Sequence, residues 1–516
     1  MSYFKTKKKK GKTFKLIILI LLIWVIVGVY FSYKATKKLE TLVYPSKEIK
    51  ILSIIKFFPS YTSELKNIGL ILSNKTPENK KGWLFTSTYK KVFDNVLMFA
   101  DINRFKKLAE YINLREKPDL AKYYGLYLFN KGEFEKAKPL LKGIEAFDKV
   151  YATNKIPVIT DILFYDIKEK KYISKYKGLK FLETLYPEKR DFLVCYKSTI
   201  RPEIQDLAEI TLGKNEGFFA IAIQNSILAI VANGVNPITD YFEPGSVIKL
   251  ITLTGYLEEE RNDIKFPFYC KKPINIDGKL FYDWKQHGKI DSFADALACS
   301  CNLVFGECGL TLGKNSLLNW YSKFYIDENK KITVCEHTFA PGRIKKPIED
   351  RYTLADAGIG LNVPEITPYW LIKTASIFAR NGKDENPTCT LIKQILGVKD
   401  SGAITQITEI GKNYVFDKNK VKEVYRGMKL AVDSPEGTGK RAKTEGMEIM
   451  LKTGTAGKKP FNAFIIGCAK YPKANTYFSF ALMLKNGGKA EYKAAQTIHN
   501  FFAAFKNIKW NKNTKN

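Results

Sequence analysis

An unbroken apolar run near the N-terminus opens the hydrophobic pattern of the chain. Residues 16–31 read LIILILLIWVIVGVYF, and with their neighbours they reach about 18–20 positions, which is enough for a helix to cross a bilayer. Seven lysines precede the run within residues 1–15. The pattern predicts a single-pass transmembrane anchor at 16–33, a basic tail in the cytoplasm and the remainder of the chain outside. The alternative is a cleaved signal peptide, which would have a shorter apolar core and small residues after it.

The next part of the chain changes from a mixed pattern to a helical one. Residues 34–81 are mixed and lysine-rich, so we expect a stalk there. Residues 82–150 have helical periodicity, with Gly125 and Ala137 where a tetratricopeptide hairpin keeps small residues for close helix packing. The pattern predicts a small helical-hairpin, TPR-like module at 82–150, with the clearest helix–turn–helix at 120–141. It serves either as a partner-binding surface or as a spacer.

Strand-like runs begin after the helical module. Residues 151–190 form a linker or pedestal segment with strand patterns, and the region that follows has strands near both of its ends and helices between them. This arrangement predicts an α+β domain over 191–510, with a sheet assembled from distant segments. The predicted strands are 218–224, 227–231, 447–451, 461–469 and 476–484, and a helix is predicted at 490–506.

Charge and cysteine content change this picture only slightly. The net charge of +32 comes from seventy-four lysines and only ten arginines. Proteins that recognise phosphate groups favour arginine over lysine. The excess of lysine therefore indicates a solvated basic surface rather than nucleic-acid binding, and no nucleic-acid partner is expected. The eight cysteines are read either as small buried hydrophobes or as disulfides. No C-x-x-C pair is present and the three histidines are scattered, so no metal site is predicted.

Ser246 and Lys249 form the first candidate for chemistry. Pro244 and Gly245 break the chain before them, and helical periodicity follows from Val247. Ser246 therefore belongs near a helix start, where free N–H groups favour a developing alkoxide, and Lys249 lies one turn further on the same face. A buried lysine with a lowered pKa can take the proton from a serine, and a second cation nearby would lower that pKa further.

Two later fragments add to the S-x-x-K pair. Ser300-Cys301-Asn302 ends a buried helical run, 54 residues after Ser246, and could relay a proton and hold a substrate backbone. Lys452-Thr453-Gly454-Thr455 follows 152 residues after Ser300. Lys452 supplies the second cation, Thr453 and Thr455 offer hydroxyls for a carboxylate, and Gly454 is expected to let a substrate strand approach. The backbone N–H groups of Ser246 and Thr455 are candidates for an oxyanion hole.

Together these three fragments resemble the penicillin-binding proteins, the acyl-serine transpeptidases that cross-link peptidoglycan. The segments AGIGLNVPEITPYWLIKTASIFARNGK and VDSPEGTGKRAKTEGMEIMLKTGTAGKKP extend the resemblance, which covers about residues 190–510. It implies a penicillin-binding/β-lactamase-like fold, an antiparallel sheet with helices on both sides. It also implies that Ser246 is acylated, Lys249 is the general base, Ser300 relays a proton, Asn302 clamps the substrate, and Lys452, Thr453 and Thr455 bind the stem-peptide carboxylate.

The resemblance further implies no cofactor, peptidoglycan stem peptides as substrates, and β-lactams as inhibitors. A glycan polymerase or other cell-wall synthesis proteins are expected as partners. The Arg-Gly…Asp-Arg-x-Gly signature of monofunctional members is not visible, which leaves the subclass open, and the glycosyltransferase signature Glu-Asp…His-x-Gly is missing. The alternatives to a transpeptidase are a D,D-carboxypeptidase, a β-lactamase-type hydrolase, and a non-catalytic cell-wall scaffold.

Overall fold

The structure is a computed structural model, and it describes most of the chain beyond residue 120. The described residues are 18–30, 121–159, 161–186, 194–224, 226–334, 337–384, 390–395, 403–405, 414–472 and 474–508. The predicted basic tail at 1–15, the predicted stalk at 34–81 and the part of the helical module at 82–120 lie outside them.

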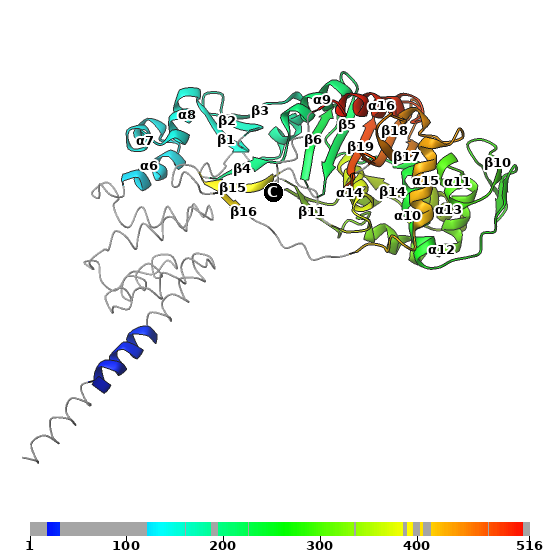
Figure 1. The fold of residues 1–516 in the computed structure, drawn as a ribbon, viewed down its shortest axis with the longest axis horizontal. Helices are drawn as coiled ribbons and strands as arrows, with labels where there is room; N and C mark the ends of the chain where they lie inside the picture. The colour runs from blue at the N-terminus through cyan, green and yellow to red at the C-terminus, as the bar shows by residue number, and fades with distance from the viewer. Residues whose placement is uncertain are drawn as a thin grey trace, which may run out of the picture.

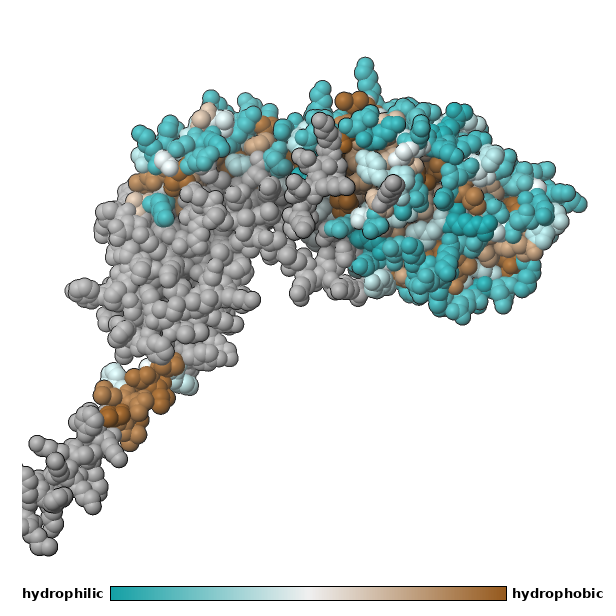
Figure 2. Space-filling view, viewed as in Figure 1, coloured by the Kyte–Doolittle hydropathy of each residue, from teal (hydrophilic) through white to brown (hydrophobic). Residues whose placement is uncertain are grey.

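The described part of the predicted anchor is an exposed apolar helix. Residues 18–30 are helical, and their large apolar side chains are exposed, which Figure 2 shows as a brown segment. The ends of the predicted span at 16–33 lie outside the described residues. Within the described residues, no helix has both the length and the apolar character that crossing a bilayer requires.

Three short helices follow in the region predicted as a helical hairpin. They are α6 (Ala121–Asn130), α7 (Phe134–Leu141) and α8 (Glu145–Thr153). The predicted helix–turn–helix is confirmed, because α6 and α7 pack together across a turn at Lys131 and Gly132. A Cβ on Gly125 would lie 2.9 Å from the side chains of Leu140 and Leu141, so this glycine allows the close approach that its position suggested.

A six-stranded sheet lies next to these helices. Its strand order is β16-β15-β4-β1-β2-β3, and β1 pairs with β4 in parallel while the other pairs are antiparallel. The strands are β1 (Lys155–Ile159), β2 (Leu163–Asp166), β3 (Lys171–Ser174), β4 (Val194–Ser198), β15 (Thr390–Ile395) and β16 (Ala403–Thr405). The sheet therefore joins the predicted pedestal segment to strands that come from inside the predicted 191–510 domain (Figure 1).

A five-stranded antiparallel sheet forms the centre of the C-terminal part. Its order is β17-β18-β19-β5-β6, so segments from both ends of this part are neighbours. The strands are β5 (Gly217–Ile223), β6 (Ser226–Asn233), β17 (Glu448–Ala456), β18 (Asn462–Lys470) and β19 (Phe478–Leu484). The predicted hairpin and the predicted C-terminal strand pair are both confirmed, and so is the α+β class with a sheet built from distant segments.

Helices cover both faces of this sheet, as Figure 1 shows. Phe219 and Ile221 of β5 pack with α9 (Pro202–Leu212) and α16 (Lys493–Phe505) in one core. The alternate residues Phe218 and Ala220 belong to a second, larger core. That second core also contains residues of α10 (Lys249–Glu258), α12 (Asn302–Lys323), α13 (Arg351–Ile359) and α14 (Pro368–Ala379). The period of two along the strands thus separates the two cores.

Further helices and short strands complete the described fold. They are η3 (Lys177–Thr184), η4 (Gly245–Ile248), α11 (Phe293–Cys299), α15 (Lys422–Asp433) and η5 (Lys440–Ala442). Short antiparallel pairs form between β7 (Phe268–Cys270) and β10 (Gly288–Ile290), β8 (Ile274–Ile276) and β9 (Lys279–Phe281), β11 (Ile332–Val334) and β12 (His337–Phe339), and β13 (Gly342–Ile344) and β14 (Pro364–Ile366).

Truncation of Phe501 tests the packing of α16 on the sheet. Phe501 is fully buried and its ring lies 4.6 Å from that of Phe219. We expect Phe501→Ala to lower the free energy of unfolding by about 3–5 kcal/mol, because a large cavity opens in a close-packed core. Thermal and denaturant unfolding followed by circular dichroism measure the effect. Ile210→Ala is the control, since Ile210 is 77% exposed on α9; equal losses in the two variants would contradict this packing.

Candidate active site

Ser246 lies in the short helical turn η4, directly before α10. The predicted helix start is therefore confirmed. Gly245 precedes it with a φ of +58°, and its N–H donates to the Gly360 carbonyl at 3.0 Å. A Cβ on Gly245 would lie 2.7 Å from the Thr455 carbonyl oxygen of β17. Only glycine satisfies both the backbone conformation and this close approach, so Gly245 seats the Ser246 turn against the sheet edge.

Lys249 begins α10 and is fully buried. Its Nζ donates to the Ser300 carbonyl at 2.7 Å, to Asn302 Oδ1 at 2.7 Å and to Ser300 Oγ at 3.2 Å. An ammonium group has three protons, so these three acceptors use all of its donors. The structure thus connects the first and second predicted fragments through the side chain of Lys249.

The second fragment lies at a sharp junction between two helices. α11 ends at Cys299, Ser300 adopts a left-handed conformation with φ +61° and ψ +41°, and α12 begins at Asn302. This matches the predicted end of a buried helix. The junction turns the Ser300 hydroxyl and the Asn302 amide toward the same ammonium group.

Lys452 reaches the same hydroxyl from β17. Its Nζ donates to Ser300 Oγ at 2.9 Å and to the Thr453 carbonyl at 2.8 Å, and the side chain is fully buried. Ser300 Oγ therefore lies between the amines of Lys249 and Lys452. Ser246 lines the adjoining pocket with Ser300, and within the described residues its hydroxyl has no hydrogen-bond partner.

Burial dominates the acidity of both lysines. It lowers the pKa of Lys249 to about 8, while the negative charge of Asp283 acts in the opposite direction. Burial, and then the positive charge of Lys249, lower the pKa of Lys452 well below its usual value. The charge of Lys452 was predicted to lower the pKa of Lys249. In the structure, desolvation is the main cause of the lowered pKa of Lys249, and the repulsion between the two lysines lowers the pKa of Lys452.

The third fragment is part of strand β17 itself. β17 is an edge strand, and the predicted strand at 447–451 continues through Lys452 to Ala456. A Cβ on Gly454 would lie 2.9 Å from the Pro244 carbonyl oxygen and from Val247 Cγ1. Gly454 thus admits the segment that carries Ser246, and the approach of a substrate strand at this position stays a prediction.

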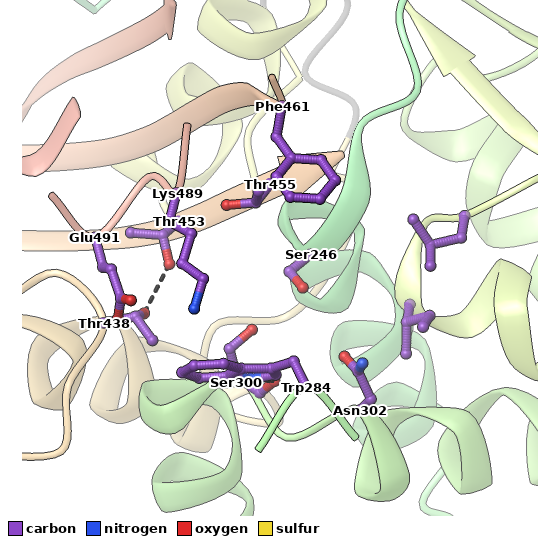
Figure 3. A pocket seen from close by; sticks show the side chains of 12 residues that line it. Ser246, Trp284, Ser300, Asn302, Thr438, Thr453, Thr455, Phe461, Lys489 and Glu491 are labelled. Carbon is purple, nitrogen blue, oxygen red and sulfur yellow. Dashed lines mark hydrogen bonds between the residues drawn. The ribbon is translucent and has the colours of Figure 1, made fainter. Parts of the chain in front are cut away.

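The two threonines of the third fragment have partners on neighbouring elements. Thr453 Oγ1 donates to Thr438 Oγ1 at 2.7 Å, and Thr455 Oγ1 accepts from the Ala490 N–H at 3.1 Å. Both line the same pocket as Ser246 (Figure 3). The roles of the Ser246 and Thr455 N–H groups as an oxyanion hole remain a prediction.

The pocket has a volume of about 320 Å³. The sequence analysis assigned its residues Ser246, Ser300, Asn302, Thr453 and Thr455. It did not assign Trp284, Ile359, Leu361, Thr438, Phe461, Lys489 and Glu491, which come from loops and helices far apart in the chain. Lys489 Nζ lies 5.4 Å from the Trp284 ring centroid, so the pocket combines an aromatic ring with an exposed cation. Spacing could not reveal these residues, although Thr438 lies in the segment VDSPEGTGK, which extends the family resemblance.

The arrangement is suited to acyl transfer to a serine. A hydroxyl faces a pocket, a buried amine lies one helical turn away, and a second hydroxyl is held between two amines. Together with an antiparallel sheet covered by helices, this site defines the class of acyl-serine transferases and hydrolases.

The comparison with known families identifies the family within this class. The description "Penicillin binding protein transpeptidase domain" matches residues 219–504, more than half of the chain. The chain belongs to this family. The match contains all three fragments that the sequence analysis singled out.

Individual curated proteins are also similar to the chain in sequence. The chain is 28% identical over 245 residues to stage V sporulation protein D of Bacillus subtilis, covering 46% of this chain and 36% of that protein. It is 26% identical over 268 residues to the peptidoglycan D,D-transpeptidase FtsI of Buchnera aphidicola, covering 49% and 43%. The chain thus spans less than half the length of these curated relatives.

A solved structure supports the fold. Pseudomonas aeruginosa PBP2 superimposes with a TM-score of 0.52 at 17% identity, covering 60% of this chain and 76% of that one. At this level of identity the likeness concerns the fold.

Substitution of Gly245 tests how the Ser246 turn is seated. We expect Gly245→Ala to cost more stability than Gly457→Ala, because both carry a positive φ but only Gly245 faces a carbonyl oxygen at 2.7 Å. Gly457→Ala should lower the free energy of unfolding by about 1–2 kcal/mol, from backbone strain alone. Gly245→Ala should lower the free energy of unfolding by about 1–3 kcal/mol more than this, because its added methyl group overpacks the contact with the carbonyl oxygen. Thermal unfolding measures both variants, and equal losses would contradict the close approach.

Proposed function

We propose that this protein is a D,D-transpeptidase that cross-links peptidoglycan stem peptides through an acyl-enzyme on Ser246. The observation that carries the proposal is the sharing of Ser300 Oγ by the amines of Lys249 and Lys452 beside the Ser246 pocket. Membership of the transpeptidase family and the similarity to the D,D-transpeptidase FtsI support the same activity.

Lys249 is the proposed general base for acylation. When its ammonium group loses a proton, one of its three hydrogen bonds must be released, and the contact to Ser300 Oγ at 3.2 Å is the longest. The neutral amine keeps its bonds to the Ser300 carbonyl and Asn302 Oδ1 and can accept the Ser246 proton. Ser246 Oγ then attacks the carbonyl carbon between the two D-Ala residues.

Ser300 is the proposed relay to the leaving group. The proton taken up by Lys249 passes through the Ser300 hydroxyl to the amine of the departing D-Ala, as the peptide C–N bond breaks and the Ser246 ester remains. Lys452 holds Ser300 Oγ from the other side at 2.9 Å. In the second half, the amine of a neighbouring stem attacks the ester, its proton returns by the same route and Ser246 is released.

The substrate carboxylate is proposed to bind beside β17. Lys452 is fully buried and makes its bonds within the protein, so it lies below the pocket and supports its floor. Thr453 and Thr455 line the pocket and offer hydroxyls, and the exposed Lys489 adds a cation that solvent and substrate can reach. A terminal carboxylate suits this combination because charge-assisted hydrogen bonds are stronger than neutral ones.

Hydrolysis competes with transfer in this proposal. A D,D-carboxypeptidase or β-lactamase needs a group that activates water against the ester, and Glu491 is the one carboxylate among the described residues that line the pocket. Among the described residues, Glu491 forms no hydrogen bond or ion pair with Ser246, Lys249 or Ser300, so transfer to an amine is the reaction that we propose. We further propose that the protein acts outside the cytoplasmic membrane, anchored by its N-terminal apolar segment, with a glycan polymerase as partner.

Replacement of Ser246 tests the proposed nucleophile. We expect wild-type protein to become labelled by a fluorescent penicillin and to gain the mass of one ring-opened antibiotic. Ser246→Ala should lose both signals entirely, because no other hydroxyl has the same place in the pocket. Gel fluorescence and intact-protein mass spectrometry measure this. Ser434→Ala, outside the pocket, is the control; labelling of Ser246→Ala at the wild-type level would refute the proposal.

The pH dependence of acylation tests the proposed base. Only the neutral amine of Lys249 can take a proton, so the acylation rate should rise with pH by about tenfold per unit below the pKa and level off above it. With the pKa lowered to about 8 by burial, the bend should fall near that value. Stopped-flow acylation by a chromogenic cephalosporin between pH 6 and 10 measures the profile. A rate that is flat across this range would contradict a lysine base.

A further inference from the structure

The segment that joins β19 to α16 brings a cation and a carboxylate into the active-site pocket. Lys489 and Glu491 both line this pocket, and Figure 3 shows them on the same side of Ser246 as Thr453. Lys489 is exposed, and Glu491 is partly buried. The mechanism proposed above gives Glu491 no role, and it leaves open which kind of amine attacks the Ser246 ester.

The local fold holds this segment against the sheet. Ala490, between the two charged residues, is 1% exposed and belongs to the core beneath α16. Its N–H donates to Thr455 Oγ1 at 3.1 Å, and the N–H of Gly488 donates to the Phe461 carbonyl at 2.9 Å. These contacts fix the backbone on both sides of Lys489, so the two charges are brought to the pocket by the fold rather than by attraction to each other.

The protein neutralises neither of these charges. Within the part of the chain that the structure describes, the side chains of Lys489 and Glu491 form no hydrogen bond and no ion pair. An ion pair between them would have satisfied both groups. Because they are unpaired, both remain available to a ligand that carries charges of the opposite signs, and such charge-assisted hydrogen bonds are stronger than neutral ones.

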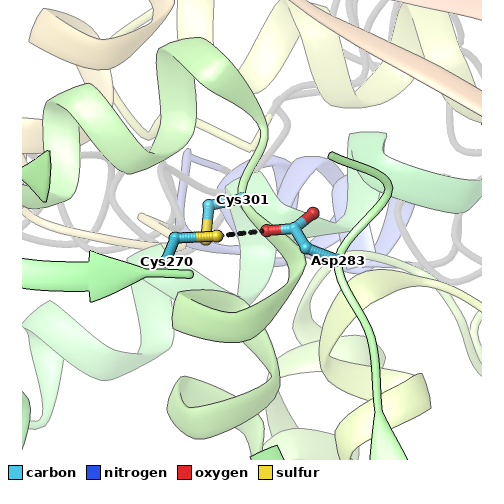
Figure 4. Close-up of side chains that lie close together, drawn as sticks. All are labelled: Cys270, Asp283 and Cys301. Atoms are coloured by element: carbon cyan, nitrogen blue, oxygen red, sulfur yellow. Dashed lines mark hydrogen bonds between the residues drawn. The ribbon is translucent and has the colours of Figure 1, made fainter. Parts of the chain in front are cut away.

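Trp284 places the ammonium group of Lys489 over the pocket. The ring centroid lies 5.4 Å from Lys489 Nζ, which is within the range of a cation–π interaction. Trp284 Nε1 donates to the Ser300 carbonyl at 3.2 Å. The preceding residue, Asp283, accepts a hydrogen bond from the Cys270 thiol at 3.2 Å (Figure 4). The ring is therefore anchored, and it holds the cation close to the proposed proton relay.

The leaving amine and the incoming amine occupy the same place. In the proposed mechanism, the departing D-Ala receives its proton through Ser300, and the acceptor amine returns a proton by the same route. The acceptor nitrogen must therefore attack the ester from the position that the D-Ala nitrogen has vacated. D-Ala carries its carboxylate on the same carbon as its amine. A pocket that accommodates this group also suits an acceptor with the same arrangement.

We propose that Lys489 and Glu491 form the acceptor subsite, and that this subsite selects an amine whose own carbon carries a carboxylate. Glu491 attracts the ammonium group of the acceptor, and Lys489 binds the adjacent carboxylate. An amine at the end of an uncharged chain leaves Lys489 without a partner, and water engages neither residue in this way. The inference rests on the proposed function and deepens it by naming the class of acceptor.

The transfer step balances as follows. The bound ammonium group releases one proton to solvent and becomes a neutral amine. Its nitrogen forms the new amide bond with the carbonyl carbon of the ester, while the bond from that carbon to Ser246 Oγ breaks. The proton that the nitrogen then gives up passes through Ser300 and Lys249 to Ser246 Oγ, which restores the hydroxyl.

Competition between acceptors for one acyl-enzyme tests the inference. The full chain receives a thioester of an N-acylated D-alanine as donor, with D-alanine, D-alaninamide or ethylamine as acceptor, and mass spectrometry quantifies transfer and hydrolysis. Both products come from the same acyl-enzyme, so their ratio does not depend on how fast the ester forms. We expect about tenfold more transfer to D-alanine than to D-alaninamide at equal concentration, because only D-alanine offers Lys489 a carboxylate.

Variants of the two residues separate their roles. Lys489→Met should lower transfer to D-alanine about tenfold and abolish the preference for D-alanine over D-alaninamide. Glu491→Gln should lower transfer to both, through a higher KM for the acceptor, so that more acceptor restores the ratio of transfer to hydrolysis. Lys493→Met and Glu445→Gln remove the same charges from exposed positions outside the pocket, and they should keep the wild-type ratio.

The outcomes distinguish this inference from the proposed function. Equal transfer to D-alanine and D-alaninamide by the wild-type protein would overturn the inference alone, and so would an unchanged preference in Lys489→Met. Penicillin labelling at Ser246 and transfer to any amine would still support the transpeptidase. Thioester hydrolysis without transfer to any of the three acceptors would overturn both the inference and the proposed transfer reaction, as would a protein that forms no acyl-enzyme.

Discussion

The position of one hydroxyl group between two buried amines is the constraint on which the active site depends. Ser300 Oγ accepts hydrogen bonds from Lys249 and from Lys452, and both lysines are fully buried. Two ammonium groups this close repel each other, and burial penalises the charge of each. The site therefore favours the loss of a proton from one of these amines, and the neutral amine of Lys249 is the form that can take a proton from Ser246.

Three separate parts of the fold maintain this arrangement. The helix junction at Ser300 aims the hydroxyl, strand β17 carries Lys452 along the sheet edge, and Gly245 with Gly454 lets the Ser246 turn lie against that edge. Stability and chemistry are linked here, since any shift of the junction separates both amines from their shared acceptor.

Much of the fold followed from local pattern alone. Alternation predicted the β5–β6 hairpin and the β18–β19 pair, and a small residue at Gly125 predicted close helix packing in the α6–α7 hairpin. The three catalytic fragments were also found from the sequence, because each combines a chain breaker or a helix end with chemically distinctive residues. These features are local, and physical chemistry acts on them within one turn or one strand.

Other features depended on contacts between distant segments. The pocket residues Trp284, Lys489 and Glu491 carry no local signal, and only the tertiary fold brings them to Ser246. In the six-stranded sheet β15 pairs with β4, which lies about two hundred residues earlier in the chain, and no periodicity encodes that pairing. Cys270, Asp283 and Cys301 lie together for the same reason, since tertiary folding brings β7 and the junction of α11 and α12 side by side. The linear chain determined which groups could react, and folding decided which of them meet.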